Sequence, residues 1–116
     1  MVPEERDPAI LQTILLLIQR IRTRLEKMTL AVFVEEPDDI DLLAYRLSMV
    51  GEYAGKLSST LRARHPEIPW SRMSGLRNIV AHEYLRVTPA RLWETAQNEM
   101  EPIATMCRTE LERFPS

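Results

Sequence analysis

The sequence predicts an all-α protein, built as an up-and-down bundle of four helices. The 116 residues include only three glycines, and the β-branched residues are scattered rather than clustered. Apolar residues recur at intervals of three and four, which is the helical period. Prolines at positions 37, 66 and 89 divide this pattern into four segments. The length fits one helical domain over residues 1–116, with its core between about residues 8 and 114.

The first helix is expected to begin at Asp7, with Asp7 as the N-cap and Pro8 at the first helical position. Residues 1–6 are then a loose terminus. The apolar stripe that follows, from Ile10 to Met28, is widened by leucines beyond what one neighbouring helix could cover. This helix therefore packs on several sides, either within a compact bundle or partly against another subunit.

The second helix is expected to start at Asp38 and to carry its apolar stripe as far as Leu61. Gly51 and Gly55 fall inside this segment, where each glycine costs about 1 kcal/mol relative to alanine. A close approach must compensate for this cost. Packing against a neighbouring helix is the simpler explanation, and the backbone of a bound molecule is the alternative.

Pro66 is expected to end the second helix, and Pro69 to occupy the first turn of a third. The third helix is predicted over residues 70–81, anchored by a buried Trp70. His65 lies in the connection and is interpreted as a loop residue without a chemical role.

The fourth helix begins with Thr88 as the N-cap and Pro89 at the first position. Its apolar pattern continues to Phe114. Pro102 falls within this pattern and is predicted to kink or split the helix.

Composition excludes several classes of protein. The single Cys107 rules out an internal disulfide and a cysteine-based zinc site, and it fits a reducing cytoplasm. No stretch approaches the roughly 20 apolar residues of a membrane span, and no signal peptide is visible. The chain lacks a glycine-rich phosphate loop and metal-ligand spacing, so no cofactor and no metal is expected.

The net charge of −2 conceals an uneven distribution. Residues 56–91 carry seven basic residues and only two acidic ones, whereas the flanking segments are acidic. This block could attract a polyanion such as RNA, or it could be a solvated surface with scattered arginines.

Residues 77–84 concentrate reactive groups within the basic block: Arg77, Asn78, His82 and Tyr84. An arginine fork suits a phosphate, and a histidine can transfer a proton near neutral pH. These two groups suffice for cleaving an RNA phosphodiester without metal, because the 2′-hydroxyl can act as the nucleophile. Asn78 could orient the phosphate or the imidazole through hydrogen bonds.

The spacing of this stretch sets a geometric condition. On one straight helix, Arg77 and His82 would point about 140° apart. Either a break near residues 82–85 brings them together, or a second chain completes each site. Structural roles remain open: Arg77 could cap carbonyls or pair with Glu52 or Glu83, and His82 and Tyr84 could lie at the edge of the core.

The pattern Arg77-Asn78-x3-His82-x-Tyr84 resembles the signature of the HepT-like toxins of the HEPN ribonuclease superfamily. Further resemblances flank it. Gly51-Glu52 is similar to the Gly-Glu pair of the family's second helix, Pro69-Trp70 to the Pro-Trp before the motif helix, and Leu92 to Thr95 to the helix that follows. The similarity covers about residues 8–112.

The resemblance implies a homodimer in which the two motifs meet across the interface. It implies a metal-independent endoribonuclease with Arg77 and His82 as catalytic residues and Asn78 in support. Lys56, Arg72 and Arg86 are candidates for additional RNA contacts.

The resemblance also implies a role as toxin of a type II/VII-like toxin–antitoxin pair. The partner would be an MNT-type nucleotidyltransferase that transfers AMP to Tyr84 and so silences the enzyme. The alternative is a non-catalytic HEPN-type module that binds RNA, nucleotide or a nucleotidyltransferase.

Overall fold

The computed structural model describes residues 2–78 and 87–114, and every regular element in these ranges is a helix. The all-α prediction is therefore confirmed. The helices are α1 (Pro3–Leu25), α2 (Leu30–Phe33), α3 (Pro37–Ala54), α4 (Ser59–Ala63), α5 (Trp70–Leu76), α6 (Pro89–Asn98) and α7 (Met100–Leu111).

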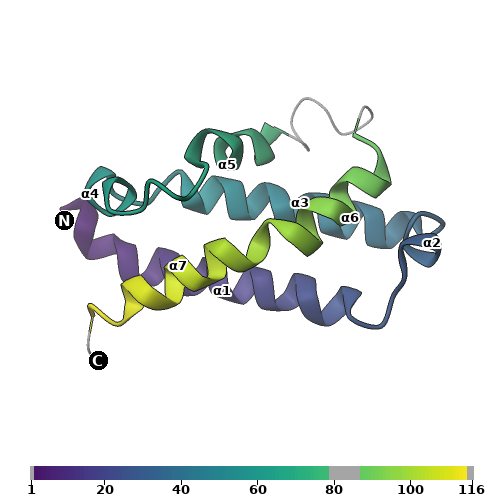
Figure 1. Ribbon diagram of the computed structural model, residues 1–116, viewed down its shortest axis with the longest axis horizontal. Coiled ribbons are helices and arrows are strands. Elements are labelled where there is room, and N and C mark those ends of the chain that lie inside the picture. The colour runs from purple at the N-terminus through teal and green to yellow at the C-terminus, as the bar shows by residue number, and fades with distance from the viewer. Residues whose placement is uncertain (1, 79–86, 115–116) are drawn as a thin grey trace.

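The long helices run lengthwise through a molecule that measures 44 × 29 × 24 Å. Helix α1 packs against both α3 and α7, and α5 lies along α3 (Figure 1). The short helices α2 and α4 lie at opposite ends of the bundle, and both chain termini lie at the α4 end. The helices are thus arranged as the predicted bundle, with short helices added in its connections.

The core forms where the apolar stripes of α1, α3 and α7 meet. Ile14, Leu47 and Ile103 are at most 2% exposed, and burying each such side chain stabilises the fold by about 1.5–3 kcal/mol. At the α2 end, the rings of Phe33 and Trp93 pack with centroids 5.3 Å apart and tie α2 to α6. The wide stripe of the first helix is therefore covered mainly within the chain, although Leu16 remains 46% exposed.

The predicted start of the first helix was wrong. Helix α1 begins at Pro3 with Val2 as its N-cap, so residues 3–6 are helical rather than loose. Asp7 lies inside the helix and is buried. Its carboxylate accepts hydrogen bonds from the Ser58 amide (2.9 Å) and hydroxyl (2.6 Å), and it joins α1 to the start of α4.

The second helix also differs from its predicted limits. Glu36, not Asp38, is the N-cap of α3, because Pro37 takes the first helical position. The helix ends at Ala54, and Gly55 is its C-cap rather than a mid-helix residue. The apolar stripe continues through Leu57 and Leu61 because α4 buries those leucines against the same core.

The expected features of the last helix are confirmed. Thr88 is the N-cap of α6 and Pro89 follows at its first position. The helix divides at Glu99, three residues before Pro102. Pro102 thereby falls in the first turn of α7, where a missing amide hydrogen leaves no helical bond unmade.

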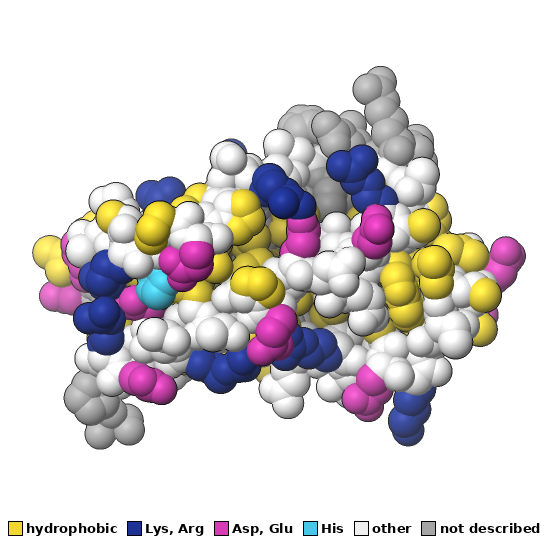
Figure 2. Space-filling model, in the orientation of Figure 1, with side chains coloured by type: hydrophobic (Ala, Val, Ile, Leu, Met, Phe, Trp, Pro, Cys, Tyr) yellow, Lys and Arg dark blue, Asp and Glu magenta, His cyan; other side chains and the backbone are white. Residues whose placement is uncertain are grey.

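None of the helices in the described ranges is long and apolar enough to cross a membrane. Figure 2 shows basic and acidic side chains interspersed over one face of the molecule. Hydrophobic side chains gather on this face near α2, where Leu30 and Val32 are 41% and 50% exposed.

Candidate functional site

Arg77 is the C-cap of α5, and its backbone is still in the right-handed helical region, with φ −64° and ψ −21°. Asn78 is the last residue described before the motif continues. Both side chains are exposed. The Ser48 hydroxyl of α3 donates a hydrogen bond to the Arg77 carbonyl oxygen over 3.3 Å. Helix α5 thus ends before the rest of the motif, and the break expected near residues 82–85 lies outside the described residues.

Gly51 lets the backbones of α3 and α5 come unusually close. A Cβ atom at this position would lie 2.6 Å from the Met73 carbonyl oxygen and 2.9 Å from the Arg77 amide nitrogen. The neighbouring Leu76 Cβ would also lie 2.9 Å away. The prediction that helix packing compensates for Gly51 is confirmed. This contact fixes the position of the Arg77 backbone relative to α3.

Gly55 has a different role from the one expected. A Cβ added there would meet only ordinary contacts, 3.5 Å from the Glu52 carbonyl oxygen and 3.6 Å from that of Gly51. No close approach requires this glycine, which stands at the end of α3.

Two of the other basic candidates are described, and both already have partners. Arg72 forms an ion pair with Glu99 at the junction of α6 and α7. The Lys56 ammonium lies 5.1 Å from the centre of the Tyr53 ring, in cation–π geometry. Arg77 makes no ion pair with any described residue, so its guanidinium is not drawn to Glu52.

A polar groove of about 490 Å³ runs between α5 and α6 next to this region. Arg72 and Arg91 line it, together with Glu94 and Glu99. Sequence reasoning counted Arg91 in the basic block but gave it no role.

His82, Tyr84 and Arg86 lie outside the described residues. The distance between Arg77 and His82 therefore stays a prediction, as does the placement of Tyr84.

A second charged cluster, which sequence reasoning missed, surrounds Glu110 of α7. This carboxylate is fully buried and accepts from Arg64 Nη2 (2.6 Å) and His65 Nε2 (2.6 Å). The bond from Arg64 is the main reason that the pKa of Glu110 falls to about 2. The other ring nitrogen of His65, Nδ1, lies 2.8 Å from Glu67 Oε2.

His65 contacts a carboxylate through each ring nitrogen, which suits the doubly protonated imidazolium. Burial by itself lowers the pKa of His65, but the bonds to Glu110 and Glu67 outweigh it, and the net pKa is raised. This cluster ties the connection after α4 to α7, and its groups neutralise one another.

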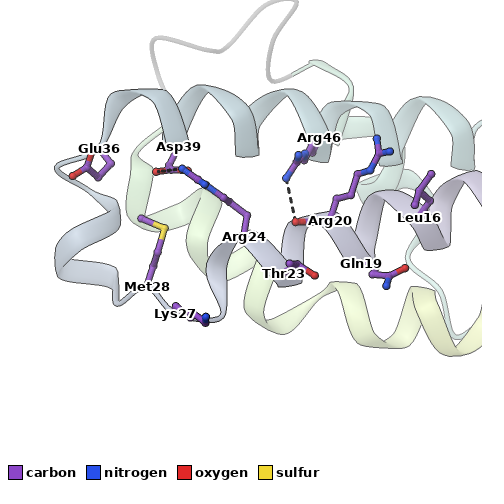
Figure 3. Close-up of a pocket in the computed structure, with 10 residues that line it drawn as sticks. All are labelled: Leu16, Gln19, Arg20, Thr23, Arg24, Lys27, Met28, Glu36, Asp39 and Arg46. Atoms are coloured by element: carbon purple, nitrogen blue, oxygen red, sulfur yellow. Dashed lines mark hydrogen bonds and ion pairs between the residues drawn. The ribbon is translucent and has the colours of Figure 1, made fainter.

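A third group of charges lines a groove between α1 and α3 (Figure 3). Arg20 and Arg24 come from α1, Lys27 follows the end of α1 at Leu25, and Arg46 comes from α3. Helical spacing of the α1 bases was the available signal. The acidic excess of residues 1–55 as a whole conceals this local group of bases.

Within the described ranges, no three histidine, cysteine or acidic residues are grouped so that they could hold a metal ion. Cys107 is buried in the core, and burial raises its thiol pKa to about 12. Neither a metal site nor a reactive thiol is therefore available from these residues.

The all-helical bundle and the Arg77-Asn78-x3-His82-x-Tyr84 pattern fit the class of HEPN-type helical proteins. Comparison with family models specifies the family. The model of the HepT-like ribonucleases, "Ribonuclease HepT-like", matches residues 14–110. The chain belongs to this family, which indicates ribonuclease activity.

Curated relatives agree with this assignment. A protein of Caldanaerobacter subterraneus subsp. tengcongensis named "Putative RNase TTE0752" is 27% identical over 104 residues, covering 90% of this chain and 89% of the relative. "Putative RNase MJ1380" of Methanocaldococcus jannaschii is 32% identical over 57 residues, about half of each chain. "Probable ribonuclease HepT" of Thermococcus cleftensis is 32% identical over 54 residues, also about half of each chain. No solved structure matches the chain.

Proposed function

We propose that this protein is the toxin of a HEPN–MNT toxin–antitoxin pair and cleaves RNA in the cytoplasm without a metal ion. The observation that carries the proposal is the R-x4-H pair, Arg77 and His82, within a chain that belongs to the HepT-like ribonuclease family. The arrangement of Arg77 supports it, because the Gly51 contact and the Ser48 bond hold its backbone while its side chain stays exposed.

The reaction follows from the chemistry of the two groups. His82 accepts the proton of a 2′-hydroxyl, whose oxygen attacks the adjacent phosphorus. The bond from phosphorus to the 5′-oxygen breaks, and protonated His82 returns the proton to this leaving oxygen. Arg77 offsets the charge that develops on the phosphoryl oxygens, and Asn78 orients the phosphate. The products are a 2′,3′-cyclic phosphate and a 5′-hydroxyl.

Further basic residues would then hold the substrate on either side of this bond. Arg72 and Arg86 flank the motif in the chain, and Lys56 follows the end of α3. Arg72 would have to exchange Glu99 for a phosphate, which makes its contribution smaller than that of an unpaired base.

A second copy of the chain would complete the site. Leu42, Tyr45 and Met49 share the outer face of α3, and Tyr45 is 55% exposed. Ser48, which bonds to the Arg77 carbonyl, lies at the edge of this face. An apolar face that adjoins the motif is suited to a homodimer interface that brings the two motifs together.

Regulation would act at Tyr84. An MNT-type nucleotidyltransferase would transfer AMP from ATP to the phenol oxygen, releasing pyrophosphate. The added phosphate would repel RNA from the adjoining site.

The direct test compares purified wild-type protein with Arg77→Ala, His82→Ala and a control, Arg6→Ala. Arg6 is exposed near the N-terminal end of α1 and makes no ion pair with a described residue. We expect RNA cleavage by wild type and Arg6→Ala in the presence of EDTA, with cyclic phosphate ends. Loss of at least about 100-fold is expected in the two motif variants.

Equal cleavage by all four proteins would rule out these catalytic residues. RNA binding without cleavage by wild type, retained in His82→Ala, would instead identify the non-catalytic binding module. The modification is tested separately by co-expression with an MNT-type nucleotidyltransferase. Mass spectrometry should find AMP on Tyr84 of the wild type and none on Tyr84→Phe, and equal modification of both would refute the assignment.

A further inference from the structure

The groove between α1 and α3 has a volume of about 880 Å³ and is open to solvent. Four basic residues and two acidic ones line it. Figure 3 shows the side chains of Arg20 and Arg46 between the two helices, with Arg24 extended toward Asp39. We call this feature the α1–α3 groove.

The bases of the groove differ in how they are used. Arg24 donates two hydrogen bonds to the carboxylate of buried Asp39, over 2.6 and 3.4 Å. Arg46 donates to the carbonyl oxygen of Arg20 over 3.1 Å and meets no described carboxylate. Arg20 and Lys27 make no ion pair with any described residue. The groove therefore keeps an excess of positive charge that the fold does not neutralise.

The crowding of these charges is visible in Arg46. Burial lowers the pKa of its guanidinium, and the neighbouring charges of Arg20 and Arg24 lower it further. An anion between Arg20 and Arg46 would relieve this repulsion, and an arginine fork can hold a phosphate through two hydrogen bonds.

The shape of the groove favours a chain of phosphates over a single one. Arg20 and Arg24 are about one turn, or 6 Å, apart along α1, and Lys27 follows just beyond the end of this helix. A row of three basic residues suits neighbouring phosphates of one nucleic-acid strand better than a single phosphate. Gln19 and Thr23 add hydrogen-bonding groups on the same helix, while Leu16 and Met28 offer apolar contacts at the two ends.

The groove and the motif lie on different sides of α3. Arg46 faces the groove, whereas Ser48, two residues later and about 200° around the helix, bonds to Arg77. Tyr45 and Met49 do not line the groove, although Leu42 of the same apolar face lines a small adjoining cavity with Arg24 and Arg46. An RNA bound at Arg77 must extend well beyond the cleaved bond to reach it.

We propose that the α1–α3 groove is a second RNA-binding site, which holds the phosphate backbone outside the cleaved segment and favours long or structured RNA. This inference rests on the proposed ribonuclease function, because it assumes that RNA is the substrate. Arg20 and Lys27 supply the contacts to phosphate, and Arg46 supports Arg20 from α3.

Binding is tested with 2′-O-methyl RNA, which cannot undergo attack by its own 2′-hydroxyl. One probe has about 30 nucleotides and the other about 8, enough for only one site. We compare wild type with Arg20→Glu, Lys27→Glu and the matched charge reversal Arg6→Glu. The three altered side chains are exposed and unpaired among described residues, and thermal melting checks that each variant is folded.

For the long probe, Arg20→Glu and Lys27→Glu should each weaken binding about fivefold or more and reduce the slope against salt by about one unit. The short probe can occupy the motif or the groove but not both, so the two charge reversals in the groove should weaken its binding less than that of the long probe. Arg6→Glu should match wild type with both probes. Equal affinity of wild type and Arg20→Glu for the long probe would overturn the proposal. So would displacement of the long probe from wild type by ATP alone at matched phosphate concentration, because the groove would then be a mononucleotide site.

The two proposals fail in different ways. If unmodified RNA is not cleaved but the long probe depends on Arg20, the catalytic function is wrong and the groove stands. If RNA is cleaved through His82 while Arg20→Glu binds and cleaves long RNA like wild type, the groove proposal is wrong and the catalytic function stands.

Discussion

At the scale of single residues, Gly51 determines how closely α5 approaches α3. It thereby fixes the position of the Arg77 backbone at the end of α5. The atoms that a side chain would meet there belong mainly to the backbone, which cannot rotate away as a flexible side chain can. Gly75 provides a contrast on α5, because a Cβ atom there would have nothing within 4 Å.

Gly51→Ala should destabilise the protein by about 2–3 kcal/mol, since inserting a methyl group forces two packed helices apart. Gly75→Ala should be neutral or stabilise by up to about 1 kcal/mol, through the helix propensity of alanine. Urea unfolding of both variants measures the difference. RNA cleavage at a temperature where both are folded should fall only in Gly51→Ala, because Arg77 shifts. A Gly51→Ala protein as stable as wild type would contradict the close approach.

Asp7 shows where residue-level prediction reaches its limit. The pair Asp7-Pro8 has the chemistry of a helix start, and Val2-Pro3 offers the same proline position earlier. What decides between them is a long-range contact, the two hydrogen bonds that Asp7 accepts from Ser58. Periodicity and capping rules consider only neighbours in the chain, so they could not detect a partner 51 residues away.

At the scale of elements, the apolar stripes identified the long helices but not their ends. The stripe of α3 runs on into Leu57 and Leu61, although the helix ends at Ala54. Ser58 explains the break, because its hydroxyl caps α4 by accepting from the Leu61 amide (3.2 Å) while donating to Asp7. The close approach at Gly51 was predictable from the position of this glycine within a helical stripe. The paired side chains of the α1–α3 groove were not, because they depend on how two helices face each other.

The free energy of unfolding should depend on pH through the contact between His65, in the α4–α5 connection, and Glu110 of α7. The folded-state pKa of His65 is raised, so its contribution to stability is fully present below its unfolded pKa of about 6.5 and is lost as pH rises through the folded value. Glu110 stays ionised down to a pKa of about 2, so it does not titrate in this range.

Wild type should therefore lose more stability between about pH 6 and pH 9 than His65→Gln does, as measured by urea unfolding at each pH. Other groups titrate equally in both proteins, and the difference isolates His65. Glu110→Gln should cost about 3 kcal/mol near pH 6, because Arg64 and His65 lose the buried carboxylate between them. Identical pH profiles for wild type and His65→Gln would show that the imidazolium does not contribute.

At the scale of the whole molecule, the proposed homodimer depends on an apolar surface of α3 next to Arg77. Most of the apolar surface of α1 is used in the core of its own chain, while α3 presents Tyr45 and Met49 beside the Ser48–Arg77 contact. Helix α5 ends with Arg77 as its C-cap, and His82 lies outside the described residues. Both arrangements from the sequence argument therefore stay predictions: a site within one chain, and a site shared by two.

A mixed dimer distinguishes these arrangements. Arg77→Ala and His82→Ala chains carrying different affinity tags are co-expressed, and the species with both tags is purified. If each site takes Arg77 from one chain and His82 from the other, one of the two sites in this dimer is intact, and about half of the wild-type cleavage rate should return. If each site takes both residues from one chain, every site lacks one group and the mixed dimer should be as inactive as either parent. The homodimers of each variant, purified by the same two steps, provide the baseline, and rescue above that baseline requires a site built across the interface.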